Sequence, residues 1–345
     1  MKTLVFGFAV LVLLFGCIDL GGGNQQNNTN TTSANVTPQQ NVSDGTIIIG
    51  QQQNQTVEQN YTKPPPSPPE QAEGLNYTLE PDANFAVYFI YVGDLTNKLH
   101  GDAILIRKGD MEVLVDAGPA QSGTKVAEFL QSRGVDDIEV LISTNADPRH
   151  YGGIDTVRSK YSVEELWWSG NAFNDQDYIS TISSLNSSVK KTRVVGRGFN
   201  MTINGMNFTV LNPKAMPFEN VNNDAIVLRI DDRNFSMVLL SGVQRGAQDE
   251  MLNTIKNELK CDVMQAPYYG LGAGTSGIAN FLSSLKPGTI VVSGGPDESA
   301  QSGGSREPFR KLMEQYNITY YENYIGGTVR VSSDGSYYSA GYFTS

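Results

Sequence analysis

One loop of the sequence concentrates residue types that bind metal ions or transfer protons. Residues 139–153, EVLISTNADPRHYGG, read as an apolar strand that runs into a polar loop containing Asp147, Arg149 and His150. His150 is one of only two histidines in the chain, and the other is His100. Carboxylate and imidazole groups that converge at a strand end can hold a metal ion or act as an acid–base pair. The first question is therefore whether this loop is a metal site or the remains of one.

The segments on both sides of this loop alternate between strand and helix patterns. Residues 85–93 and 101–118 are apolar runs rich in branched side chains and broken at glycines, which is typical of strands joined by turns. Residues 123–134 have apolar side chains at helical spacing and end on a glycine. The second half of the chain repeats this plan and ends in an expected hairpin at residues 318–338. We expect an α/β domain over residues 84–345, in which two mixed sheets pack face to face with helices outside.

Several of these segments together resemble the metallo-β-lactamase fold, and in particular the soluble C-terminal domain of ComEC-type DNA-uptake competence proteins. The family motif DVGQGDAILI is similar to YVGDLTNKLHGDAILI at residues 91–106, with an insertion before Gly101. The family motif LIDAGP is matched by LVDAGP at residues 114–119, and NDNSIVLRI is matched by NNDAIVLRI at residues 222–230. The resemblance covers nearly all of residues 85–340 and implies a four-layer αββα sandwich.

The metal-binding motifs of this family are only partly present. The family's first metal loop reads roughly THxDxDHxGG, and the matching segment here is TNADPRHYGG at residues 144–153. Other residue types stand at several ligand positions: Asn145 for a His, Arg149 for an Asp, Val243 for the bridging Asp, and Tyr268 and Tyr269 for a pair of His residues. Asp147 and His150 are the ligands that remain, and two are too few for a zinc ion, which takes three or four. We therefore expect no metal and no other cofactor, with zinc or manganese as the alternative.

The residues at these positions are expected to line one ligand pocket at the strand ends. Asp102 and Asp116 are included because they match family positions near the metal or behind its ligands, although turn geometry would also explain both. The expected pocket residues are Asp102, Asp116, Asn145, Asp147, Arg149, His150, Tyr268 and Tyr269. Asp147 and His150 are the catalytic candidates: they could act as an acid–base pair, or they could hold the loop or a ligand.

The N-terminal residues are expected to direct export and attachment to a membrane. Residues 1–17 combine one lysine with an apolar run that suits a signal-peptide core and is short for a membrane span. They end in LFGC, which resembles a lipobox in which Cys17 would carry the lipid; an uncleaved membrane anchor is the alternative. Residues 18–83 are rich in Asn, Gln, Thr and Pro and are expected to form a disordered linker. Sequons such as Asn30 and Asn317 fit an exported glycoprotein.

Composition narrows the choice of partners. The formal net charge is −11, and we expect no nucleic-acid partner because neutralising phosphates requires an excess of Lys and Arg. The one basic segment, VKKTRVVGRG at residues 189–198, is interpreted as a solvated strand edge rather than a phosphate-binding track. Cys261 is the only cysteine besides Cys17, and we interpret it as a structural thiol rather than a nucleophile.

These features predict an exported, lipid-anchored protein on the extracellular face of the cell membrane. Its metallo-β-lactamase-like domain is expected to have lost most metal ligands and to act as a non-catalytic binding module. The partner would be an unknown small molecule or another surface component. The alternative is a metal-dependent hydrolase that acts on phosphodiester or ester bonds, in the manner of a nuclease.

Overall fold

The computed structural model describes residues 70–93, 100–271, 276–295 and 305–344. All of them belong to one unit, Lys63–Ser345. The predicted signal with Cys17, and most of the predicted linker, lie outside the described residues. Within the described ranges, no helix combines the length and the apolar character that crossing a membrane requires.

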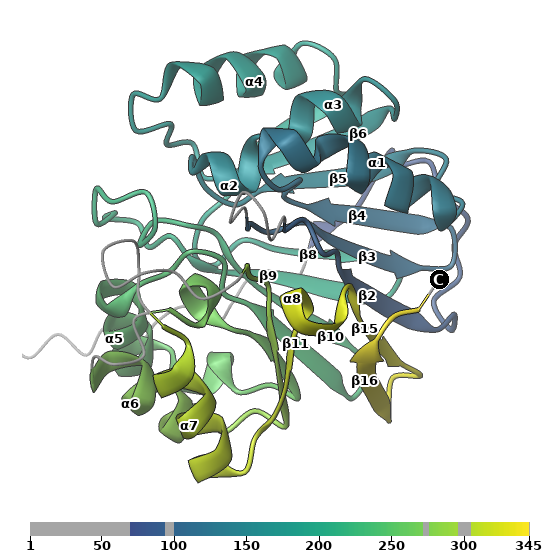
Figure 1. The fold of residues 1–345 in the computed structure, drawn as a ribbon. Coiled ribbons are helices and arrows are strands. Elements are labelled where there is room, and N and C mark those ends of the chain that lie inside the picture. The colour runs from purple at the N-terminus through teal and green to yellow at the C-terminus, as the bar shows by residue number, and fades with distance from the viewer. Residues whose placement is uncertain (1–69, 94–99, 272–275, 296–304, 345) are drawn as a thin grey trace, which may run out of the picture. The chain divides into compact units, whose positions relative to one another are not determined.

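The first sheet has eight strands in the order β16-β15-β2-β3-β4-β5-β6-β7. They are β2 (Phe85–Phe89), β3 (Ile104–Lys108), β4 (Met111–Val115), β5 (Ile138–Ser143), β6 (Val163–Trp168), β7 (Lys191–Val194), β15 (Val329–Ser333) and β16 (Tyr338–Tyr342). Pairing is antiparallel from β16 to β4 and parallel from β4 to β7. Helices α1, α3 and α4 lie along the outer face of this sheet (Figure 1). The helices on this side are η1 (Ala120–Ser122), α1 (Gly123–Ser132), α2 (Pro148–Tyr151), α3 (Ile154–Arg158) and α4 (Gln176–Asn186).

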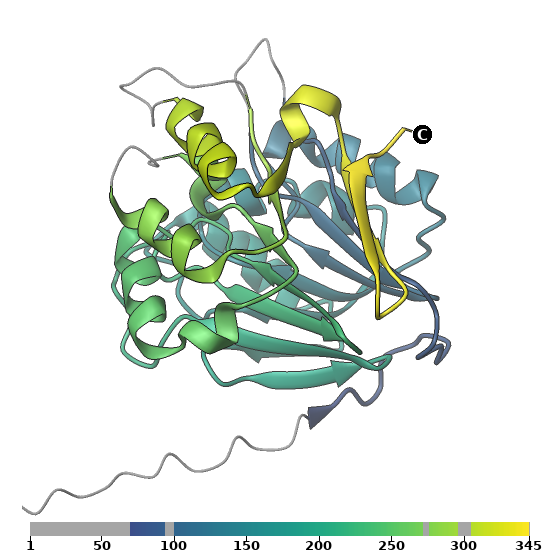
Figure 2. The same ribbon diagram turned by 90° about the horizontal axis from the view of Figure 1, so that it is seen from below.

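The second sheet repeats this plan in the order β1-β8-β9-β10-β11-β12-β13-β14. Its strands are β1 (Glu70–Gln71), β8 (Asn200–Ile203), β9 (Met206–Asn212), β10 (Val227–Asp232), β11 (Phe235–Leu239), β12 (Val263–Gln265), β13 (Thr289–Val292) and β14 (Thr319–Glu322). Pairing is antiparallel from β8 to β11 and parallel from β11 to β14. Helices α5, α6 and α7 cover its outer face (Figure 2). The helices in this half are α5 (Arg245–Thr254), η2 (Lys256–Leu259), η3 (Pro267–Gly270), α6 (Ser276–Leu285), α7 (Glu307–Tyr316) and α8 (Asn323–Gly326).

Apolar side chains on both faces of the strands produce the layers. In β4, Val113 packs in the core between the two sheets, whereas Leu114 packs against the helices of the first half. In β11, Met237 and Val238 divide in the same way between the central core and the helices of the second half. This period of two follows from the strand geometry, because successive side chains point to opposite faces. The four-layer αββα sandwich predicted from the sequence is confirmed.

Two segments differ from the expectations. Residues 70–83, which composition assigns to the linker, contact the domain: β1 pairs with β8, and the Asn204 N–H donates to Tyr77 Oη. The hairpin expected over residues 318–338 is divided between the sheets, because β14 pairs with β13 whereas β15 pairs with β2. The helix α8 lies between β14 and β15, where the chain passes from one sheet to the other, and the alternating strand pattern alone does not reveal it.

The basic segment and the free cysteine have structural surroundings. Residues 189–198 contain β7, which is an edge strand as expected, and Arg193 on it pairs with Glu70. Cys261 is a free, half-buried cysteine. Burial raises the pKa of the Cys261 thiol to about 12, so it stays protonated at neutral pH.

The two ends of the sandwich carry different polar groups. The loops after β4 and β5 in the first sheet and after β11 and β12 in the second meet at one end, because parallel strands leave their carboxyl ends on the same side. At the opposite end, Lys108 of β3 pairs with Asp232 of β10 across the two sheets, with 2.6 Å between Nζ and Oδ1. The candidate site lies at the first of these ends.

Candidate metal centre

The loop after β5 enters α2 through two short-range hydrogen bonds. Asn145 Oδ1 accepts from the backbone N–H of Asp147 (2.8 Å), and Asp147 Oδ1 caps α2 by accepting from the backbone N–H of Arg149 (2.9 Å). Pro148 lies in the first turn of α2, where an N–H would have no partner within the helix. This geometry puts His150 one turn into the helix, with its side chain in the interior.

His150 meets two carboxylates there. Asp102, Asp116 and His150 each offer a ligand atom, and these atoms lie within 4.8 Å of one another. Asp116 Oδ2 lies 2.8 Å from His150 Nδ1 and also accepts a hydrogen bond from Thr144 Oγ1 (2.6 Å). Burial lowers the pKa of His150, but the charge and hydrogen bond of Asp116, together with the charges of Asp102 and Asp147, raise it above its ordinary value.

Asp102 is the member of the group with free acceptor capacity. Its side chain is buried, and neither carboxylate oxygen has a partner at good hydrogen-bond geometry among the described residues, although the side chains of Ser293 and Gln265 lie close enough to lower its pKa slightly. His150 Nδ1 lies 3.5 Å from Asp102 Oδ2. Burial raises the pKa of Asp102 to about 6; His150 opposes this rise and Asp116 adds to it. Buried acceptors without partners are rare in folded proteins, and a bound cation is one of the few arrangements that satisfies them.

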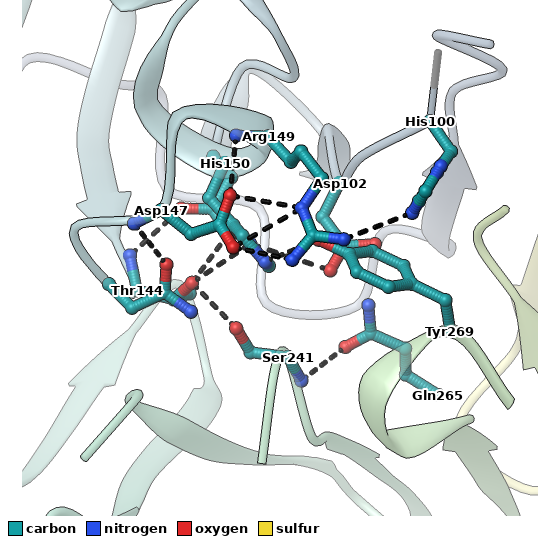
Figure 3. A network of polar contacts seen from close by, with 11 residues as sticks. His100, Asp102, Thr144, Asp147, Arg149, His150, Ser241, Gln265 and Tyr269 are labelled. Carbon is teal, nitrogen blue, oxygen red and sulfur yellow. Dashed lines mark hydrogen bonds and ion pairs between the residues drawn. The ribbon is translucent and has the colours of Figure 1, made fainter. Parts of the chain in front are cut away.

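The second sheet contributes Tyr269 and Ser241 to the same cluster. Tyr269 Oη lies 2.6 Å from His150 Nε2, so both ring nitrogens of His150 contact an oxygen. Ser241 Oγ lies 2.7 Å from Thr144 Oγ1, and the backbone N–H of Ser241 donates to Gln265 Oε1 (2.9 Å). Figure 3 shows these side chains turned toward one another from both sheets. The cluster therefore ties the two halves of the sandwich together at the strand ends.

Four residues in or beside this cluster have a strained backbone. Asp116, Ser241, Tyr268 and Tyr269 all adopt left-handed conformations, with φ between 46° and 58°. Such a conformation in a residue other than glycine costs on the order of 1 kcal/mol and persists only where the surroundings enforce it. Residues in strained conformations are typical of sites whose geometry serves binding or chemistry.

Arg149 and Asp147 form the outer part of the site. The Arg149 guanidinium donates to both carboxylate oxygens of Asp147, and the shortest of these bonds measures 2.6 Å (Figure 3). Arg149 Nη1 lies 3.2 Å from His100 Nε2, and its guanidinium carbon lies 5.1 Å from the centre of the Tyr269 ring. Burial raises the pKa of Asp147, but the hydrogen bonds and charge of Arg149 outweigh it and lower the pKa. The expected acid–base pair of Asp147 and His150 is not formed, because each has a different partner.

The structure brings the predicted pocket residues to one end of the molecule in three groups. Asp102, Asp116 and His150 form the buried group; Asp147 and Arg149 form the ion pair; Asn145, Tyr268 and Tyr269 surround them. His100, Thr144 and Gln265 also belong to the cluster but were not among the predicted residues. Thr144 follows the end of β5 and Gln265 ends β12, and a polar residue at a strand end is a feature by which the sequence could have identified both as site residues. Nothing in the sequence places His100 beside Arg149.

The expectation that the domain holds no metal is contradicted. The expectation counted Asp147 and His150 as the remaining ligands and placed Asp102 and Asp116 beside them in the pocket, whereas the structure joins Asp102 and Asp116 to His150 in one group. Two carboxylates and an imidazole are suitable ligands for zinc or manganese, and the unpartnered oxygens of Asp102 fit such a role. The described residues therefore contain a group that could hold a metal ion.

Comparisons with known proteins agree with this fold. Residues 96–171 match the family model described as the metallo-beta-lactamase superfamily. This match agrees with the resemblance that the motifs indicate. Among curated proteins the chain is homologous to ComE operon protein 3 of Bacillus subtilis (strain 168), with 24% identity over 213 residues. That match covers 61% of this chain but 27% of the relative, so the chain spans about a quarter of the length of that protein.

Two solved structures are similar to this chain at lower sequence identity. The metallo-beta-lactamase fold protein YhfI from Bacillus subtilis is 13% identical with a TM-score of 0.47, and the match covers 75% of this chain and 100% of YhfI. Igni18, a metallo hydrolase from Ignicoccus hospitalis, is 10% identical with a TM-score of 0.46, and the match covers 71% of this chain and 98% of Igni18.

Proposed function

We propose that the protein is a binding module of the metallo-β-lactamase fold that holds a divalent cation and a ligand without turning over a substrate. Burial is the observation that supports this proposal most directly. The side chains of Asp102, Asp116 and His150 are at most 1% exposed. Hydrolysis requires a scissile bond and a water molecule beside the catalytic groups, and these three groups have almost no surface available to either.

Arg149 and Tyr269, which lie next to the buried group, support the same proposal. The side chain of Arg149 is 30% exposed, and it is fixed to Asp147 rather than directed away from the site. The hydroxyl of Tyr269 contacts the ring nitrogen of His150 that faces away from Asp116. A cation held by Asp102, Asp116 and His150 would balance two buried carboxylates, which are costly to bury without a counter-charge.

A metal-dependent hydrolase acting on phosphodiester or ester bonds is the second candidate. The carboxylate of Asp102 has no hydrogen-bond partner among the described residues, and its pKa of about 6 suits a general base near neutral pH. The strained conformations of Asp116 and Tyr269 also suit an active site. This candidate requires the residues that bury Asp102, Asp116 and His150 to move during turnover, so that substrate and water can reach these three groups.

Metal titration combined with a turnover assay separates the two candidates. Isothermal titration of the purified protein with Zn²⁺ or Mn²⁺ should give one site per chain. Asp102→Asn should lower the affinity at least about tenfold because it removes a ligand charge. Asp155→Asn, at an exposed carboxylate, is the matched control and should leave the affinity unchanged. The metal-loaded protein should hydrolyse bis-p-nitrophenyl phosphate and p-nitrophenyl acetate no faster than the metal-loaded His150→Ala variant.

Two results would overturn the binding proposal. If the wild-type protein and Asp102→Asn bound both metals with equal affinity, the cation would not be held by Asp102. Hydrolysis that is lost both on chelation and in His150→Ala would establish the second candidate instead.

Export and lipid attachment are part of the same proposal and rest on the sequence of residues 1–17. The lipid at Cys17 would hold the domain at the extracellular face of the membrane, where its partner would be a small molecule or a surface component. A net charge of −11 supports a partner other than nucleic acid. Cys17→Ala should move the protein from the membrane fraction to the soluble fraction of its cells, and an unchanged distribution would contradict the lipid anchor.

A further inference from the structure

A second concave site lies away from the buried acidic group. The loops after β6, β7 and β9 enclose a pocket of about 490 Å³, and none of its lining residues belongs to the cluster around His150. A volume of this size is typical of pockets for small organic molecules. Its wall includes Ser169, Asn171, Val194, Pro213, Lys214 and Pro217. The pocket thus combines apolar surface with polar groups and one lysine.

Two of the three charged side chains at this pocket already have partners within the protein, an ion pair for Arg197 and backbone hydrogen bonds for Asp224. Arg197 forms a two-pronged ion pair with Glu250, with N–O distances of 2.9 and 2.6 Å. The buried carboxylate of Asp224 accepts hydrogen bonds from the backbone N–H groups of Phe218 (2.7 Å) and Asn220 (2.9 Å). Both charges therefore have partners within the protein, and neither is available to a ligand without breaking these bonds.

Lys214 is the third charged group, and it forms no direct ion pair, although its charge helps to lower the pKa of Glu250 after the larger effect of Arg197. Its Nζ lies 4.0 Å from the centre of the Phe218 ring, a cation–π contact that holds the ammonium at the pocket. No ion pair joins Lys214 to a carboxylate anywhere in the described part of the chain. In a protein with a net charge of −11, an unpaired lysine at a concave, partly apolar surface is an attachment point for an anion.

We propose that this pocket binds a small organic anion, whose carboxylate or phosphate group contacts the ammonium of Lys214. The organic part of the ligand packs against Val194, Pro213 and Pro217. Ser169 and Asn171 provide hydrogen-bonding side chains on the same wall. Lys214 is the cationic group of this wall without a direct ion pair, and it selects a single anionic group over a polyanion, because a polyanion would meet only one partner and would lie near the carboxylates of Glu250 and Asp224.

Titration with benzoate, phenyl phosphate and benzamide tests this proposal in the full chain. Backbone amide signals of residues around the pocket, such as Gly170 and Gly196, should shift with benzoate or phenyl phosphate in two-dimensional NMR spectra. The anion that binds more tightly identifies the headgroup. Benzamide has the same ring without the charge and should bind at least about tenfold more weakly than benzoate, the loss of one charge-assisted contact.

Three substitutions test where the anion binds. Lys214→Gln should weaken binding of the preferred anion about tenfold, whereas Lys160→Gln, which makes the same charge change at an exposed residue at the amino end of β6, should leave it unchanged. Ala215→Trp should block the pocket by filling it. The proposal is overturned if neither anion shifts the pocket signals, if benzamide binds as well as benzoate, or if both lysine variants weaken binding equally. Because Asp102→Asn should leave this binding intact, failure here is distinguishable from failure of the cation site.

Discussion

The two ends of the sandwich each bury charged groups, and they do so in different ways. At one end, Lys108 and Asp232 have fully buried side chains, and each charge faces an opposite charge 2.6 Å away. Asp232 also accepts from Arg233 (3.0 Å), and Asn204 donates to the backbone oxygen of Lys108 (2.8 Å). At the other end, Asp102 is equally buried but has no hydrogen-bond partner among the described residues. The Lys108–Asp232 pair is balanced within the chain, whereas the carboxylate of Asp102 is not.

This difference separates a structural role from a binding role. A satisfied ion pair fixes how the two sheets meet, and nothing external can improve it. An unsatisfied buried carboxylate destabilises the fold unless something binds to it. Left-handed residues occur at both ends, at Asn204 and Arg233 as well as at Asp116 and Tyr269, so strain alone does not distinguish them. The unpaired acid does, and it is consistent with a site whose missing charge is supplied from outside.

Breaking the balanced end should give the largest effect. Lys108→Met leaves the carboxylate of Asp232 buried with only the half-exposed Arg233 as a cationic partner. Removing one member of a buried pair typically costs about 3–5 kcal/mol of the free energy of unfolding. Urea unfolding followed by circular dichroism measures this loss.

The pair also provides its own controls. Lys108→Met combined with Asp232→Leu removes both charges and should recover most of the lost stability, because no charge is left unpaired. Lys311→Met breaks an exposed ion pair with Glu307 on α7 and should change the free energy of unfolding by less than about 0.5 kcal/mol. A loss of stability in the double variant as large as in the single one would show that packing of the lysine stem, and not its charge, stabilises this end.

The layered fold could be predicted from local patterns. Val113 and Leu114 are both apolar, and a strand with apolar residues on both faces must be covered on both sides. The motif that contains Asp116 placed this residue correctly at the end of a strand. The prediction was wrong near the end of the chain, where α8 separates two strands of an expected hairpin and each strand joins a different sheet.

The contacts of the site could not be predicted in the same way. His150 meets Asp116 from 34 residues away and Tyr269 from 119 residues away, and only the packing of two sheets brings them together. The family's motif lies in the loop around His150, but Asp102, which completes the group, lies in a different part of the sequence. Whether an acid has a partner is a property of the whole fold and not of its neighbours in sequence.

Removing the charge of Asp102 should change the free energy of unfolding in the opposite direction to breaking the pair of Lys108 and Asp232. In the presence of a chelator at pH 7, Asp102→Asn should raise the free energy of unfolding by up to about 3 kcal/mol. The pKa of Asp102 is raised from 3.8 to about 6, so ionising it in the folded protein is unfavourable, and the amide avoids this cost. Asp116→Asn is the matched control and should destabilise, because Asp116 accepts hydrogen bonds from Thr144 and contacts His150.

The pH dependence and the response to metal sharpen this last comparison. A raised pKa means that the stabilising contribution of protonated Asp102 is complete below about pH 4 and is lost as the pH rises through about 6. The stability difference between Asp102→Asn and the wild-type protein should therefore be smallest near pH 4 and grow up to about pH 7. Zn²⁺ or Mn²⁺ should reverse the order at pH 7, because a bound cation stabilises the wild-type protein more than the variant. A difference independent of both pH and metal would mean that Asp102 stays protonated and binds no cation.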